Sequence, residues 1–141
     1  MSRMSEECRE PPRILVVDDN ESNRDLLSRR LEKKDFQVAT AGGGRQALEM
    51  LAREPFQLVL LDIMMPDMSG IEVLREIRKT RSASELPVIM ATAKSDSTDV
   101  VEALDLGAND YVTKPIDFSV LLARVQAQLR IRPVAAATAP R

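Results

Sequence analysis

Short apolar runs alternate with amphipathic stretches along most of this chain. The apolar runs lie at residues 14–17, 36–39, 58–61, 88–91 and, more weakly, 111–112. Three of them, 14–17, 58–61 and 88–91, are apolar at every position, which is typical of strands buried on both faces of a parallel sheet. The pattern therefore predicts five short strands, of which at least three lie inside the domain.

The segments between the runs have helical spacing over about 10 to 15 residues. The clearest one has apolar side chains at i, i+3, i+4, i+7 and i+11, namely Phe118, Leu121, Leu122, Val125 and Leu129. Ser69 and Glu72 have the spacing of a capping box at the start of another helix, and Asp117 is placed to cap the last one. Five β-α units predict an α/β domain with a doubly wound, five-stranded parallel sheet.

The 141 residues suffice for one domain, which we place at residues 13–130. Residues 1–12 are polar and read as a flexible leader, and residues 131–141 read as an Ala/Pro linker or tail. We interpret the tail as a linker to a further domain, with a disordered natural C-terminus as the alternative.

Polar side chains follow several of the predicted strands. Asp18 and Asp19 follow the first, Asp62 follows the third, Thr92 the fourth, and Lys114 the fifth. In open α/β sheets, ligands bind beyond the carboxyl ends of the strands. Three clustered carboxylates repel one another, and a divalent cation relieves that repulsion. Oxygen ligands without His or Cys favour Mg²⁺, with Mn²⁺ as the alternative, and the added hydroxyl and ammonium suit phosphoryl transfer.

Composition removes several other classes of function. The net charge is −2, so no basic excess indicates direct binding to nucleic acid or to a membrane surface. There is no histidine, which excludes a Ser-His-Asp triad and argues against a zinc site. If phosphoryl transfer involves a phosphohistidine, that histidine must therefore belong to another protein. The single cysteine, Cys8, cannot form an internal disulfide, and without a signal peptide or an apolar span we expect a cytoplasmic protein.

Four motifs carry a resemblance to a known family. They are VVDDN at 16–20, LLDIMMPDMSG at 60–70, MATA at 90–93 and GANDYVTKP at 107–115. From about Arg13 to Arg130 the chain resembles the receiver domains of two-component signalling. The resemblance implies a flavodoxin-like sheet with strand order 2-1-3-4-5.

The resemblance also implies roles for individual residues. Asp62 would accept the phosphoryl group. Asp18, Asp19 and Asp62 would hold Mg²⁺ together with the backbone carbonyl of Met64. Lys114 would contact the phosphoryl group.

A second set of roles concerns the switch. Thr92 would move towards the phosphoryl group, and Tyr111 would swing inward into the space that Thr92 leaves. A simpler interpretation of Tyr111 is a half-buried strand aromatic. Lys114-Pro115 would be a cis peptide bond.

The partners implied are a sensor histidine kinase or a histidine phosphotransfer protein. The output would be an effector domain in the same longer chain, with a stand-alone regulator or phosphorelay shuttle as the alternative. A homodimer would use the face of the fourth helix, fifth strand and fifth helix, which could equally be a solvated surface. Such a domain is not an enzyme, because it acts only on its own phosphorylation.

Three rival functions have less support. A dehalogenase-type phosphatase needs a second acid two residues beyond the nucleophile, where this chain has Met64. A flavin or nucleotide site would present glycines rather than Asp18 and Asp19 to phosphate. A receiver that binds a partner without being phosphorylated would not need the acceptor, metal-binding and lysine positions, all of which are present. The run Gly42-Gly43-Gly44 fits no phosphate-binding motif, and we interpret it as a flexible entry to a helix.

Overall fold

The computed structural model describes residues 11–93 and 97–130, so the predicted leader (1–12) and tail (131–141) lie almost wholly outside the described residues. Strands and helices alternate along the chain. The strands are β1 (Arg13–Val17), β2 (Gln37–Ala41), β3 (Leu58–Asp62), β4 (Val88–Ala93) and β5 (Asp110–Lys114). The helices are α2 (Glu21–Glu32), α3 (Gly44–Arg53), α4 (Gly70–Thr80), α5 (Ser97–Leu106) and α6 (Phe118–Arg130).

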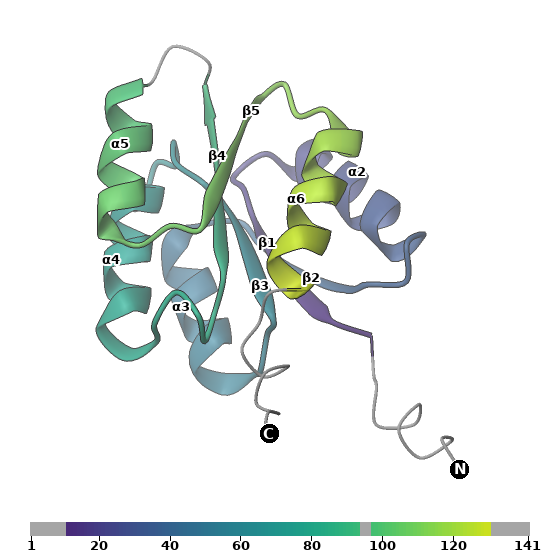
Figure 1. The fold of residues 1–141 in the computed structure, drawn as a ribbon, viewed down its shortest axis with the longest axis horizontal. Coiled ribbons are helices and arrows are strands. Elements are labelled where there is room, and N and C mark those ends of the chain that lie inside the picture. Colours follow the sequence, from purple (N-terminus) through teal and green to yellow (C-terminus); the bar gives the residue numbers. More distant parts are fainter. Residues whose placement is uncertain (1–10, 94–96, 131–141) are drawn as a thin grey trace.

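All neighbouring strands pair in parallel, in the order β2-β1-β3-β4-β5, which confirms the predicted sheet. Helices α2 and α6 cover one face, and α3, α4 and α5 cover the other (Figure 1). The three central strands β1, β3 and β4 are almost wholly buried, as their unbroken apolar runs predicted. Alternate residues of these strands face the two helical layers.

Two hydrophobic clusters fill the space between the sheet and its helices. Leu15, Val59 and Leu61 face α3 and α4, where they pack with Leu74 and Ile77. On the other face, Ile14, Leu58 and Leu60 pack with helix residues such as Leu31 and Leu121. Burial of this apolar area is the main stabilising contribution and holds the strand ends, and therefore the residues that follow them, in fixed positions.

Local sequence signals set several helix boundaries. The Ser69 hydroxyl accepts from Glu72 N–H while the Glu72 carboxylate accepts from Ser69 N–H, which confirms the predicted capping box. Asp117 caps α6 through Ser119 N–H. Gly107 has a φ of 108°, a left-handed conformation that ends α5 and favours glycine. Among the described residues, no helix is both long and apolar enough to cross a bilayer.

Candidate functional site

The carboxyl ends of β1, β3, β4 and β5 meet at one edge of the sheet. Asp18 and Asp19 follow β1, and Asp62 is the last residue of β3. The chain runs from β1 outward to β2 and then returns across β1 to β3, so these acids lie where the winding of the sheet changes direction. Such switch points are the usual ligand sites of open α/β sheets.

Three carboxylates gather at this point. One oxygen each from Asp18, Asp19 and Asp62 lies within 4.8 Å of the other two. Asp18 and Asp62 are buried, whereas Asp19 is exposed to solvent. The sequence placed all three at one edge, and the structure brings them into a single cluster.

Lys114 supplies the positive charge of the site. Its Nζ lies 2.9 Å from Oδ2 of Asp62 and 3.7 Å from Oδ2 of Asp18. The side chain thus reaches from β5 past β4 to acids on β3 and after β1. Lys114 is thereby the charged partner of the buried Asp62 carboxylate.

The chemistry of the acid cluster allows a test of whether a metal fits here. Asp62 Oδ2 is buried beside the Lys114 ammonium, and it lies inside a cluster of three acids whose mutual repulsion a further cation would relieve. Oxygen-only ligands with one side open to solvent suit a hard divalent cation such as Mg²⁺. The donor set is therefore that of an acidic pocket able to bind a metal ion.

The environment of Asp62 raises its pKa above the ordinary value of 3.8. The largest cause is burial, since the side chain is almost excluded from water (2% exposed). Lys114 and the backbone N–H of Met64 lower the pKa, while the neighbouring Asp18 raises it. Burial has a larger effect on this pKa than the Lys114 ammonium has. The ionised form of Asp62 is therefore destabilised in the folded protein, and a second cation would stabilise it.

This raised pKa gives a prediction for stability in metal-free protein. Between pH 3.8 and the folded-state pKa, the folded chain binds more protons at Asp62 than the unfolded chain does. The free energy of unfolding of wild type therefore falls as pH rises through this window. We expect Asp62→Asn to gain stability relative to wild type over the same interval, measured by urea unfolding in the presence of EDTA. A difference between the two proteins that does not change with pH would contradict the prediction.

Asp18 is held by residues that the sequence analysis did not single out. The N–H of Asn20 donates to Oδ1 of Asp18 at 2.9 Å, and the Arg24 guanidinium donates to the Asp18 carbonyl at 2.8 Å. The side chain of Asn20 also caps α2. An asparagine directly before a helical pattern is a recognisable cap, whereas the Arg24 contact depends on where α2 packs.

Thr92 and Tyr111 are the two residues assigned to the switch. The Thr92 hydroxyl and the Tyr111 N–H each donate to a neighbouring residue of the same strand and not to the three carboxylates of the cluster. Thr92 is buried on β4, and its hydroxyl donates to the carbonyl of Ala93 at 3.3 Å. Tyr111, on β5, is 36% exposed. The Lys114-Pro115 peptide is cis, as the resemblance implied.

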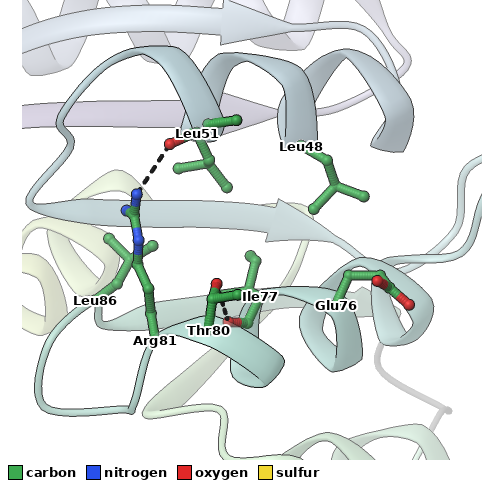
Figure 2. Close-up of a pocket in the computed structure, with 8 residues that line it drawn as sticks. Leu48, Leu51, Glu76, Ile77, Thr80, Arg81 and Leu86 are labelled. Carbon is green, nitrogen blue, oxygen red and sulfur yellow. Dashed lines mark hydrogen bonds between the residues drawn. The ribbon is translucent and has the colours of Figure 1, made fainter.

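Two of the hollows in the surface of the described residues show how apolar surface lies relative to the acids. One of about 250 Å³ adjoins Lys114 and is lined by Asn23, Leu26, Leu27, Lys114, Pro115 and Ile116. The other, of about 110 Å³, lies between α3 and α4 (Figure 2). Its lining combines leucine and isoleucine with the polar residues Glu76, Thr80 and Arg81, and Arg81 donates to the Leu51 carbonyl. It lies at the amino end of the strands, away from the acids, and presents no set of metal ligands.

Comparison with known proteins agrees with this geometry. The sequence model of the response regulator receiver domain family matches residues 14–126 of this chain. An uncharacterised transcriptional regulatory protein of Bacillus subtilis, YkoG, is 46% identical over 117 residues, covering 83% of this chain and 50% of that protein. The chain thus spans about half the length of this curated relative.

Solved structures show the same fold. A CheY-like receiver domain from Methanospirillum hungatei is 31% identical with a TM-score of 0.82, and the match covers 89% of this chain and 98% of that one. The BeF3-activated receiver domain of DrrB is 39% identical with a TM-score of 0.76, covering 85% and 98%. Fold and site define an α/β domain with an acidic, metal-competent pocket at the switch point of its sheet. The chain belongs to the response-regulator receiver family of two-component signalling.

Proposed function

We propose that this domain takes a phosphoryl group onto Asp62 in a reaction that depends on Mg²⁺. The observation that carries the proposal is the contact between a buried carboxylate and an ammonium inside a cluster of three acids. Asp18, Asp19, Asp62 and the Met64 carbonyl would hold the ion. When bound, it would neutralise charge on the transferred group.

The remaining chemistry belongs to the protein. A carboxylate oxygen of Asp62 attacks phosphorus as the bond to the leaving group breaks, and the leaving group keeps the electron pair. Lys114, already 2.9 Å from Asp62, stabilises the negative charge of the phosphoryl oxygens. Thr92 turns its hydroxyl from Ala93 to the new phosphate, and Tyr111 moves inward from its half-exposed position. These two changes shift the domain from an inactive to an active state.

The donor we infer is a phosphohistidine on a partner protein, either a sensor histidine kinase or a histidine phosphotransfer protein. The chain has no histidine of its own. Exposed Leu26 and the hollow beside Lys114 offer apolar surface for a protein donor next to the residue that contacts Asp62. The domain is not an enzyme with a separate substrate, because the group it acts on is its own.

The output we infer is an effector in the same, longer chain. YkoG, a transcriptional regulatory protein, is about twice the length matched here, which supports this arrangement over a stand-alone regulator or shuttle. Homodimers would form through α5, β5 and α6, where Val101, Leu104, Tyr111 and Val120 are exposed. The cytoplasmic location and the absence of direct nucleic-acid binding by this domain stay predictions from the sequence.

The proposal is tested by incubating the protein with acetyl phosphate, with Mg²⁺ or with EDTA. We expect a gain of about 80 Da, the mass of one phosphoryl group, only when Mg²⁺ is present. Borohydride reduction of the acyl phosphate followed by peptide mapping should place the group on Asp62. Modification at another residue, or a gain that survives EDTA, would contradict the proposal. If no gain is seen, beryllofluoride binding decides, because this phosphoryl analogue does not hydrolyse, and failure to bind it would refute the proposal.

A further inference from the structure

The glycine run 42–44 leads into helix α3, and two of its residues are also closely packed. Gly43 has φ −169° and ψ 173°, an extended conformation open to any residue. What limits the position is close approach, because a Cβ built on Gly43 would lie 2.9 Å from both carboxylate oxygens of Asp67. Gly44 is equally crowded by Met68 and Val73. Gly43 and Gly44 thus form a packing surface for the loop that follows β3.

Asp67 lies against Gly43 because it caps helix α3 from a distance in sequence. Its Oδ1 accepts from Gly44 N–H at 3.2 Å, and its Oδ2 accepts from Arg45 N–H at 3.3 Å. Gly43, the residue at the N-cap position, supplies no side-chain bond of its own. The two backbone donors hold the pKa of Asp67 below its usual range. The carboxylate is therefore ionised and bound to α3 at neutral pH.

The cap also anchors the loop that carries one proposed metal ligand, Met64, and directly follows another, Asp62. This loop, residues 63–69, is fixed at its start by Met64 N–H donating to Asp62 Oδ1 and at its end by Gly70 N–H donating to the Ile63 carbonyl. Both bonds are local to the loop, whereas the N–H of its first residue, Ile63, donates to the Ala91 carbonyl of β4 at 3.1 Å. Among the hydrogen bonds of the described residues, those of Asp67 tie the middle of the loop to another element.

We propose that Asp67 is a positioning residue for the metal-dependent reaction at Asp62. By binding the first turn of α3, it fixes the loop so that the Met64 carbonyl and the Asp62 carboxylate face Asp18 and Asp19. The inference rests on the proposed function. Its rival is that Asp67 serves only the stability of α3, as any helix cap does.

A matched control separates the two roles. Glu85 is likewise an exposed acid that accepts from a backbone N–H, that of Ser82 at 2.8 Å, and its pKa is lowered by that bond. It lies in the loop before β4, at the opposite end of the strands from Asp62. Glu85→Ala thus removes a similar bond without touching the loop after β3.

The first experiment measures Mn²⁺ affinity from the electron paramagnetic resonance signal of the free ion. We expect Asp67→Ala to weaken binding about ten-fold, the usual effect of losing a residue that orients a ligand, and Glu85→Ala to leave it unchanged. Asp67→Asn keeps one acceptor oxygen and should lie between Asp67→Ala and wild type. In the phosphorylation assay, Asp67→Ala should lower the phosphorylation rate most at limiting Mg²⁺. At saturating Mg²⁺ the rate should return close to that of wild type.

The second experiment uses Gly43→Ala, whose methyl group would displace the Asp67 carboxylate from its donors. We expect the same loss of Mn²⁺ affinity as for Asp67→Ala, and no further loss in the double variant, because both changes break one contact. Additive losses, or equal affinities of Asp67→Ala and Glu85→Ala, would overturn the positioning role. If wild type neither binds Mn²⁺ nor accepts a phosphoryl group, the proposed function fails instead.

Discussion

Asp62→Asn is expected to lose phosphorylation, with the rate on acetyl phosphate falling by about 10³-fold or more. An amide oxygen is a far weaker nucleophile than a carboxylate, and the substitution also removes one of the three acids of the cluster. The fold should persist, because the amide fills the same buried volume and removes a charge that burial disfavours. Intact mass measured over time after addition of acetyl phosphate and Mg²⁺ gives the rate.

A matched control for this variant is Asp25→Asn. It makes the same chemical change on the exposed surface of α2, where Asp25 forms an ion pair with Arg29. It should be phosphorylated at the wild-type rate, since exposed ion pairs contribute little. Phosphorylation of Asp62→Asn at a rate near that of Asp25→Asn would show that another residue is the acceptor.

Lys114→Ala is expected to lower the phosphorylation rate by about 10²- to 10³-fold, the usual cost of removing one group that stabilises transition-state charge. The Nζ of Lys114 is the cation in contact with Asp62, at 2.9 Å. Its loss also leaves Asp62 buried without an ion pair, so the metal-free protein should unfold at a lower temperature. The rate at saturating Mg²⁺ is the quantity to measure, because it separates charge stabilisation from metal binding.

Lys79→Ala is the corresponding control. Lys79 forms an ion pair of the same length, 2.9 Å, with Glu76 on the surface of α4. Its removal should change neither the phosphorylation rate nor the melting temperature by a measurable amount. A Lys114→Ala protein that reacts as fast as Lys79→Ala would exclude the proposed role of the ammonium.

The sequence predicted the sheet well because its central strands are buried on both faces. A short, unbroken apolar run such as 58–61 is typical of a strand covered by helices on both sides, and β3 begins and ends almost where that run does. The edge strand β2 was placed less accurately, at 36–39 rather than Gln37–Ala41. An edge strand tolerates polar residues such as Thr40, so the apolar run stops before the pairing does.

The sequence predicted which residues gather at the candidate site but not how their side chains are oriented or which other residues hold them. Position after a strand was enough to gather Asp18, Asp62 and Lys114 at one edge. The orientation of the Thr92 hydroxyl depends on local geometry that no sequence pattern records. The hydrogen bond from Gly44 N–H to Asp67 joins residues 23 positions apart, which the packing of α3 against α4 brings together.

The groups that would carry the reaction come from four strand ends that are spread over most of the domain, from Asp18 to Lys114. No short stretch of the chain contains all of these groups. The sheet brings them together only after all four strands have paired. Phosphoryl uptake should therefore report on the integrity of the whole sheet. A kinase paired with such a domain would be unable to load a nascent or partly unfolded copy, so only fully folded regulators would ever carry a signal.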